Sequence, residues 1–412
     1  MRRNTLFKLF YLLFLLGLIG IFLGVYGRSV YRRSKQLYRY AKHRRRGWNG
    51  PVFEPDEILG FRSRPGAVGA HTFPIGENLP MRFDRNGFRV SVDARSDYFH
   101  RPYVLALGCS FTYGDACRAE DTYPHLVAAT LGGTELNAGL CSYGLSQMLI
   151  LARKLIPEYR PEYILFQYSP WLLNRSCRKF APTRYSHAPN PYFIDGKEGT
   201  VKLHPPVFTC KTVDLGPWRN TPIGSSDFRS FFFKIGLPLA LHDDFNLLVF
   251  KIKSALAMLP DPTDRRNAVI KAAYGEIKEL AEKYDSELII VGLGNLNNPL
   301  KIPSALEEMD LTTVNAHAEL LSRLEKPTEY HYCRAYAHFR GDPPVRVDRH
   351  PNPTAHRIIA DAILATIENI SEEEIENLVP PEKGVEHQVQ GNHLIDPETG
   401  ETEGIEEHLP GI

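Results

Sequence analysis

The sequence lacks several patterns that would assign a function or a class of protein directly. Its six cysteines include no Cys-x-x-Cys pair and no cysteine and histidine spacing typical of zinc ligands, so we expect no metal and no cofactor. No internal repeat is present, which argues against solenoids and propellers. The formal net charge is only +1 and no nucleic-acid-binding module is recognisable, so nucleic acid is not an expected partner. The even number of cysteines permits disulfides in an exported protein and does not settle the compartment.

An uncharged apolar run lies near the N-terminus. Residues 9–26 contain no charged side chain over a length that suffices, as a helix, to cross about 30 Å of hydrocarbon. We interpret residues 1–27 as a single-pass transmembrane anchor. A cleaved secretory signal is the alternative, with Val25-Tyr26-Gly27 as a weak cleavage site, although the run is longer than the typical apolar core of about 7–15 residues.

A basic segment, which we call the collar, follows the anchor within residues 28–52, interpreted as a juxtamembrane linker. Its Lys and Arg residues from Arg28 to Arg46 outnumber Arg2, Arg3 and Lys8 on the other side of the anchor. The positive-inside rule then favours a cytoplasmic body. Alternatively, the collar lies along anionic headgroups, at about 1 kcal/mol per residue near the surface. The side of the membrane on which the body lies stays open.

The body combines an N-terminal extension with an alternation of strands and helices. In the extension, residues 53–101, the segments 53–62 and 83–90 have the composition of short strands and turns, and Asn86-Gly87 is a hairpin signal. The elements predicted after it are strand 103–107, helix 122–131, strand 135–138, helix 145–156, strand 163–168, helix 265–284, strand 287–293, helix 313–325 and helix 354–369. Near-continuous apolar strands that alternate with helices predict a three-layer α/β/α fold, with a central, mostly parallel sheet covered on both faces.

Three segments depart from this alternation. Residues 171–262 are rich in proline, aromatic and turn residues, including Phe231-Phe232-Phe233, and we interpret them as an insertion or lid over the strand ends. Residues 341–352 are predicted as a loop. Residues 371–412 are acidic and lack apolar periodicity, so they are predicted to be a disordered tail.

The stretch Gly-Cys-Ser-Phe-Thr-Tyr-Gly, residues 108–114, directly follows the strand 103–107. Ligands of open α/β sheets bind beyond the carboxyl ends of the strands, which makes Ser110 a candidate nucleophile. Helix-start N–H groups near it would favour a developing oxyanion, and Gly108 and Gly114 would let the backbone bend and approach other elements closely. Helix capping by Ser110 is the alternative interpretation.

The base and the acid that such a serine needs occur together near the C-terminus. Asp348 and His350 lie in one short segment, so little loop-closure entropy opposes their contact. A solvated turn is the alternative interpretation of this Asp-x-His spacing. His356, on the following helix, is the competing histidine, and we expect it to support the loop.

The order of four motifs resembles that of the SGNH, or GDSL-like, hydrolase family. These are the stretch 108–114, the Asn-Ala-Gly-Leu-Cys-Ser-Tyr-Gly stretch 137–144, the strand end 167–170 and the Asp-Arg-His-Pro-Asn-Pro-Thr-Ala-His stretch 348–356. The resemblance covers residues 102–370 and implies an SGNH or flavodoxin-like fold. The segments 54–62 and 86–89 resemble the extension of a membrane-associated branch, related to carbohydrate esterases and O-acetyltransferases, and this is compatible with an extracytoplasmic body.

The resemblance also implies roles for individual residues. Ser110 would be the nucleophile, His350 the base and Asp348 its orienting acid. The oxyanion would be held by the N–H of Ser110, by the N–H of a glycine in the second motif and by an asparagine side chain after the third strand.

The chain departs from the family pattern at three positions. Cys109 replaces an aspartate that does no chemistry, and a Cys109 nucleophile is conceivable, although its side chain should point away from the serine. Ser142 stands where the second-motif glycine would be; its N–H can still donate, and Gly139 is the fallback. Trp171 stands where the asparagine should be, with Asn174 three residues later. If Asn174 does not swing back, the missing donor costs about 100- to 1000-fold in rate.

Three functions follow as hypotheses. The first is a membrane-anchored serine esterase that acts on short-acyl or O-acetyl esters, including carbohydrate-linked ones, with Trp171 as the candidate substrate-binding residue. The second is an O-acetyltransferase that passes the acyl group to a carbohydrate hydroxyl with the same triad. The third, motivated by the missing asparagine, is a non-catalytic binding protein on this fold.

Overall fold

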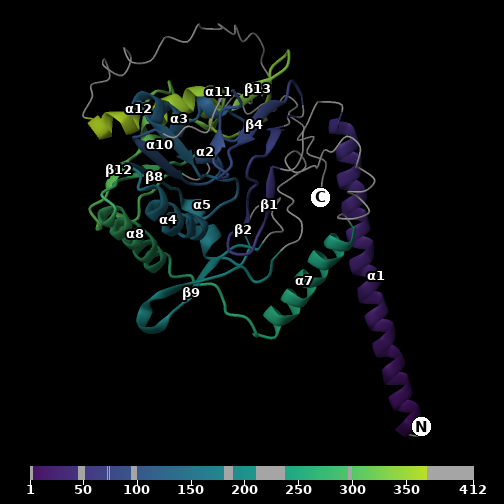
Figure 1. Cartoon of the computed structure of the whole chain (residues 1–412). Helices are drawn as coiled ribbons and strands as arrows, with labels where there is room; N and C mark the ends of the chain where they lie inside the picture. Colours follow the sequence, from purple (N-terminus) through teal and green to yellow (C-terminus); the bar gives the residue numbers. More distant parts are fainter. Residues whose placement is uncertain are drawn as a thin grey trace.

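Five parallel strands form the central sheet of the body (Figure 1). The computed structural model describes residues 3–44, 52–71, 73, 75–93, 100–180, 189–209, 237–295 and 299–368. The sheet consists of β12 (Thr312–Val314), β11 (Glu287–Gly292), β8 (Tyr163–Tyr168), β6 (Tyr103–Leu107) and β7 (Thr134–Asn137), in that spatial order. If the five strands are numbered along the chain and the sheet is read from β7 to β12, the order is 2-1-3-4-5, as in flavodoxin-like sheets. The order reverses between β6 and β8, and ligands of such sheets bind at the carboxyl ends of the two strands that flank this point.

Helices cover both faces of the sheet, which confirms the three-layer α/β/α fold. Alternate strand residues face opposite cores, so Leu105 and Leu107 pack in one core while Val104 and Ala106 pack in the other. The first core is covered by α4 (Leu145–Tyr159), α5 (Pro170–Ser176), α8 (Arg266–Lys283) and α9 (Ser304–Glu307). The second core is covered by α3 (Tyr123–Thr130), α10 (Ala316–Ser322), α11 (Glu329–Tyr336) and α12 (Pro353–Glu368).

The N-terminal extension forms small antiparallel sheets that pack on the body. Its strands are β1 (Phe53–Asp56), β2 (Gly60–Ser63), β3 (Val68–His71), β4 (Leu79–Phe83) and β5 (Arg89–Val90), paired as β1 with β2 and as β3 with β4 and β5. The predicted hairpin at Asn86-Gly87 is confirmed between β4 and β5. Phe61 and Phe83 share a buried core with Tyr113 and Tyr143 of the body. The extension is therefore packed against the turn that follows β6.

Two predicted segments differ from the structure. The helix predicted over 313–325 begins too early, because residues 312–314 form the edge strand β12 and the Asn315 side chain caps α10 by accepting the Ala318 N–H. The loop predicted over 341–352 contains β14 (Val345–Asp348), which pairs with β13 (His338–Arg340). Pro343 and Pro344 lie between these strands, and because proline is uncommon within strands, the sequence pattern predicted a loop instead of a hairpin.

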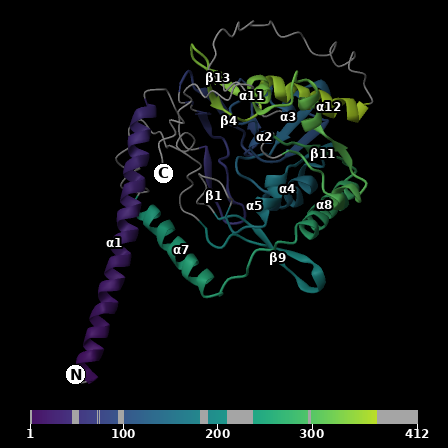
Figure 2. The same cartoon turned by 180° about the vertical axis from the view of Figure 1, so that it is seen from behind.

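The helix α1 (Arg3–Arg44) extends far beyond the body, and its apolar part, Phe7–Gly27, is exposed (Figures 1 and 2). The length of this part and its mean hydropathy of 2.5 suffice for a membrane crossing, and a signal sequence near the N-terminus meets the same criteria. Most of the collar continues α1 as helix, as far as Arg44.

The predicted insertion contains several described elements. They are most of α5, the hairpin of β9 (Tyr192–Asp195) and β10 (Val201–His204), the short turn η2 (Lys197–Gly199) and α7 (Leu237–Ala255). Outside the insertion, η1 (Ala119–Asp121) is a second short 3₁₀ helix and precedes α3. The helix α7 contacts α1, as both views show. Phe231-Phe232-Phe233 and the predicted tail 371–412 lie outside the described residues.

Candidate active site

The turn after β6 places Ser110 at the carboxyl end of the sheet. Ser110 is the first residue of the single-turn helix α2 (Ser110–Tyr113) and is 7% exposed. A Cβ atom on Gly108 would lie 1.9 Å from Thr112 Oγ1 and 2.5 Å from Gln167 Oε1, so no larger residue fits there. Gly114 follows α2 with φ +72°, a left-handed conformation that glycine adopts at little cost. Both glycines around Ser110 are therefore required by the turn.

Gln167, near the carboxyl end of β8, holds this turn. Its Oε1 accepts the Cys109 N–H at 2.9 Å and the Thr112 hydroxyl at 2.8 Å, and its Nε2 donates to Ser169 Oγ at 2.8 Å. Gln167 is fully buried, so water could not replace these hydrogen bonds, and losing them would leave buried polar groups unsatisfied. The sequence contains a signal for this role, since Gln167 is a lone amide in the apolar strand 163–168.

His350 and Asp348 are hydrogen-bonded to each other. His350 Nδ1 lies 2.5 Å from Asp348 Oδ1, and the same oxygen accepts the His350 backbone N–H at 2.8 Å. Burial alone would raise the pKa of Asp348, but the charge and the hydrogen bond of His350 hold it well below its usual value. An ionised carboxylate only accepts hydrogen bonds, so Nδ1 carries a proton in either charge state of the ring, and Nε2 is the nitrogen that can gain or lose one.

Phe111 and Asp115 join His350 to the Ser110 turn. The rings of Phe111 and His350 lie edge to face with centroids 5.6 Å apart. The Asp115 N–H donates to the Ser110 carbonyl at 3.0 Å, and Asp115 Oδ2 lies 3.7 Å from His350 Nε2. Ser110 Oγ itself contacts Cys109 Sγ, at 3.9 Å.

Asp115 and His71 are site residues that the motifs do not reveal. Asp115 is 1% exposed, and its Oδ1 lies 3.1 Å from His71 Nδ1. His71 ends β3 of the extension, and its Nε2 lies 4.0 Å from Asp348 Oδ2. Imidazoles and carboxylates thus alternate around a closed ring of His350, Asp348, His71 and Asp115. Asp115 is signalled only by its place directly after the motif, and His71 is brought here by the folded extension.

The second motif supplies two predicted oxyanion donors, Gly139 and Ser142. A Cβ atom on Gly139 would lie 2.8 Å from the Tyr113 backbone nitrogen, so this segment is packed against α2. The Gly139 N–H already donates to Asn137 Oδ1 at 3.1 Å. Ser142 has φ +68°, in the left-handed region. Of the two donors, Gly139 would have to give up a hydrogen bond to bind an oxyanion.

The helix α5 places Trp171 at the site and Asn174 one turn further on. The Trp171 indole N–H donates to Cys109 Sγ at 3.4 Å, and its ring centroid lies 5.2 Å from that of Phe111. Both Trp171 and Asn174 are half-buried. The residue that stands in place of the expected asparagine therefore has its N–H engaged by Cys109.

Cys109 is fully buried among hydrogen-bond donors. Its Sγ accepts from Trp171 Nε1 and, at 3.3 Å, from Gln167 Nε2. Burial opposes ionisation of the thiol, but the charge of Arg175 and the surrounding N–H donors together lower the pKa of Cys109 below its usual value. Cys109 thus has no exposed surface, whereas the neighbouring Ser110 is 7% exposed.

His356, the competing histidine, lies behind the site. Its Nδ1 accepts the Tyr123 N–H at 3.2 Å, so the ring supports the start of α3 rather than the loop 348–352. Burial lowers the pKa of His356 to about 3, with further lowering by the charges of His338 and other neighbours. His356 is therefore a neutral structural residue at ordinary pH.

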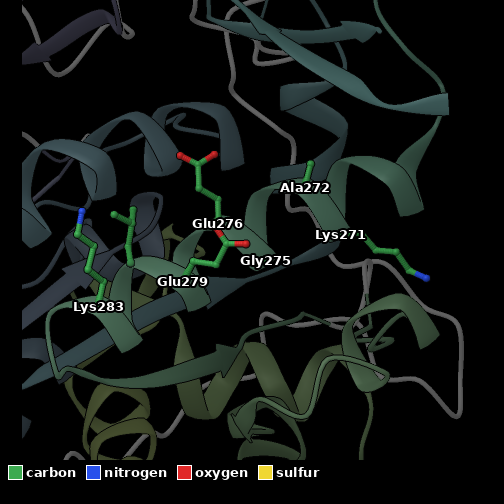
Figure 3. A pocket seen from close by; sticks show the side chains of 7 residues that line it. Lys271, Ala272, Gly275, Glu276, Glu279 and Lys283 are labelled. Atoms are coloured by element: carbon green, nitrogen blue, oxygen red, sulfur yellow. The ribbon is translucent and has the colours of Figure 1, made fainter. Parts of the chain in front are cut away.

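A surface hollow of about 590 Å³ lies on α8 (Figure 3). Its lining runs along α8 from Lys271 to Lys283 and includes none of the predicted site residues. Two of its charged groups are paired, Glu276 with Arg153 at 2.7 Å and Lys271 with Glu308 at 2.9 Å. We interpret it as a solvated helix face.

Comparison with known proteins adds a structural resemblance. No protein-family model matches the chain, and no curated protein matches it. Solved structures that resemble it include a lipolytic protein of the G-D-S-L family from Desulfitobacterium hafniense, with 10% identity, 65% of this chain and 100% of that chain covered, and a TM-score of 0.29. A GDSL-like lipase from Bacteroides thetaiotaomicron has 10% identity, coverage of 65% and 88%, and a TM-score of 0.32. An acetylxylan esterase from Geobacillus stearothermophilus has 13% identity, coverage of 66% and 97%, and a TM-score of 0.32. Likenesses this distant support no function, which has to be argued from the side chains.

Proposed function

We propose that the chain is a serine esterase that hydrolyses O-acyl esters, with short-acyl or O-acetyl esters as substrates. One observation carries this proposal: the turn with Ser110 contacts His350, which is hydrogen-bonded to the ionised Asp348. A serine hydroxyl, an imidazole with a basic Nε2 and a carboxylate on its Nδ1 are the groups that acyl transfer through a serine needs.

The proposed reaction proceeds through an acyl-enzyme. Ser110 Oγ attacks the acyl carbon while His350 Nε2 accepts its proton; the bond to the alkoxy oxygen then breaks, and His350 returns the proton to the leaving alcohol. A water molecule next loses a proton to His350 and attacks the acyl carbon, and Ser110 leaves with that proton. Asp348 on one side of the ring and Asp115 on the other stabilise the imidazolium formed in each step.

The tetrahedral intermediates carry a negative oxygen that needs N–H donors. We propose the backbone N–H groups of Ser110 and Ser142 and the side chain of Asn174 for this role. Gly139 is the weaker candidate because its N–H is bound by Asn137. A missing donor would cost about 100- to 1000-fold in rate.

Labelling with a fluorophosphonate tests the nucleophile, because only an activated serine reacts readily. The full chain in detergent is compared with Ser110→Ala and with the neighbouring control Cys109→Ala. We expect Ser110→Ala to lose labelling and to turn over p-nitrophenyl acetate at least about 1000-fold more slowly, while Cys109→Ala is still labelled. Labelling of Ser110→Ala at the wild-type rate would reject the proposal, and an unlabelled wild-type chain would favour a non-catalytic binding protein. Intact and lysed cells labelled in parallel also report on which side of a membrane the body lies.

Trp171 favours a second candidate, transfer of the acyl group to a carbohydrate. Its half-buried indole lies beside Phe111 next to Ser110, and aromatic faces stack well on the C–H groups of sugar rings. In this reaction a sugar hydroxyl takes the place of water in the second step. Acetylated glycan formed at the expense of free acetate would support transfer, whereas no transfer product at any acceptor concentration would leave hydrolysis alone.

A further inference from the structure

The helix α7 has one face that packs toward the body. The ring of Phe250 lies edge to face on that of Phe180, with centroids 4.9 Å apart, and Lys179 Nζ lies 5.8 Å from the centre of the Phe250 ring. Asp243 and Asp244, earlier in the helix, are buried. These contacts fix which side of α7 is turned inward.

A second face of α7 is apolar and exposed. Phe245, Ile252 and Leu256 are 58%, 49% and 62% exposed. At about 100° per residue, Ile252 and Leu256 lie within about 20° of Phe245 around the helix axis, so the three side chains form one line, which we call the α7 stripe. Leu256 belongs to the same helical surface, because its N–H donates to the Ile252 carbonyl at 3.0 Å. Large apolar side chains lined up on a surface indicate a contact partner.

Two exposed lysines flank the α7 stripe. Lys251 and Lys253 lie about 120° to one side and about 80° to the other side of Phe245. Lysine beside an apolar stripe is typical of helices that lie in a membrane interface, where the stripe enters the acyl region and the ammonium groups remain among the headgroups.

The position of α7 identifies its partner as a lipid bilayer. In both views α7 meets α1 and lies between α1 and the body, while the N-terminal end of α1 projects beyond the body (Figures 1 and 2). The helix α7, with its exposed stripe, is thus a neighbour of the helix that carries the exposed apolar span Phe7–Gly27. We propose that α7 is an interfacial helix, which binds the bilayer surface beside α1 and holds the body against the membrane.

Fluorescence quenching by lipids tests this proposal on the full chain. Phe245→Trp and Leu256→Trp are reconstituted into vesicles of phosphatidylcholine and phosphatidylglycerol, with or without bromine near the headgroup end of one acyl chain. Val345→Trp is the matched control, because Val345 is also exposed, at 51%, but lies on β14 of the body. The wild-type chain supplies the background of the three native tryptophans.

We expect the added emission of both α7 variants to fall about twofold in brominated vesicles, since interfacial helices place their apolar face about 5–10 Å into the bilayer boundary. Val345→Trp should not respond. Ile252→Glu, added to Phe245→Trp, should abolish the quenching. Asn246→Glu, which lies outside the stripe on the same side as Lys253, should not. An unchanged thermal unfolding midpoint in detergent shows that each variant is folded.

Quenching of the α7 variants no greater than that of Val345→Trp would overturn the proposal. If their emission instead shifts to shorter wavelength with rising protein concentration and ignores the bromines, a second copy of the chain covers the α7 stripe, and the lipid assignment is wrong.

Discussion

Around His350 each imidazole faces a carboxylate, whereas on the side of the proposed oxyanion donors two neighbouring N–H groups are already hydrogen-bonded to other residues. His350 lies between Asp348 and Asp115. By contrast, the Gly139 N–H is bound by an asparagine, and the Trp171 N–H by a buried thiol. If Ser110 and His350 act as we propose, the partners of the imidazole are already in place, while the tetrahedral intermediate needs donors other than the Gly139 and Trp171 N–H groups or an exchange of their partners.

Replacing the two carboxylates beside His350 gives the largest expected contrast. Asp348→Asn should lower kcat about 1000-fold or more, because the amide can donate to Nδ1 and hold the imidazole in the wrong tautomer. Asp115→Asn should lower kcat only about 10-fold, because Asp115 supports the imidazolium without setting the tautomer. Steady-state kinetics with p-nitrophenyl acetate measures both. Equal losses would show that the two carboxylates act as one unit and would contradict the prediction that only Asp348 sets the tautomer of His350.

The side of the proposed oxyanion donors is tested by Asn174→Ala and Trp171→Phe. We expect Asn174→Ala to lower kcat about 100-fold with little change in KM, as loss of one oxyanion donor does. Trp171→Phe keeps an aromatic ring beside Phe111 but removes an N–H that is bound to Cys109, so its effect on kcat should be smaller. The reverse order would make the indole the third donor and Asn174 a bystander.

Gly108→Ala tests whether the turn that carries Ser110 and the contacts of Trp171 both depend on the packing around Gln167. The added methyl group would meet Thr112 Oγ1 and Gln167 Oε1, and Gln167 also contacts Cys109 beneath Trp171. We expect the free energy of unfolding to fall by about 2 kcal/mol, the range of an overpacked core. Gly275→Ala is the control, since the nearest atom to its Cβ would be 3.7 Å away and alanine favours the α8 helix. Chemical denaturation in detergent measures both changes, and a neutral Gly108→Ala would contradict this dependence.

Local patterns predicted the sheet and the main chemical groups, and contacts between distant segments account for the rest. The bounds of β6 and β8 coincide with the predictions, because short apolar runs between turn residues define strands locally. Asp348 and His350 were found because they lie two residues apart. Gln167, Asp115 and His71 come from three separate segments, and no spacing along the chain reveals that they converge. The prediction of a membrane-associated branch and the assignment of Asn174 stay predictions.

The last prediction concerns His356, whose titration should affect the stability of the fold and leave the pH dependence of kcat unchanged. Burial lowers the pKa of His356 to about 3, while a histidine in the unfolded chain has a pKa of about 6.5. Between these pH values the unfolded state binds a proton at His356 and the folded state does not. The folded state therefore keeps its full stability above about pH 6.5 and loses stability as the pH falls toward 3. The free energy of unfolding should therefore decrease by up to about 1.4 kcal/mol per pH unit from this residue alone.

His356→Asn removes this titration and retains an oxygen that can accept the Tyr123 N–H. Denaturation of the wild type and the variant between about pH 7 and pH 5 should give curves whose difference shrinks on acidification, since other histidines contribute equally to both. The pH dependence of kcat should be the same in the two proteins, because we propose that His350, not His356, accepts the proton of Ser110. A parallel pair of stability curves would mean that His356 binds its proton equally in the folded and unfolded states, and a shifted kcat profile would place it among the groups that transfer protons.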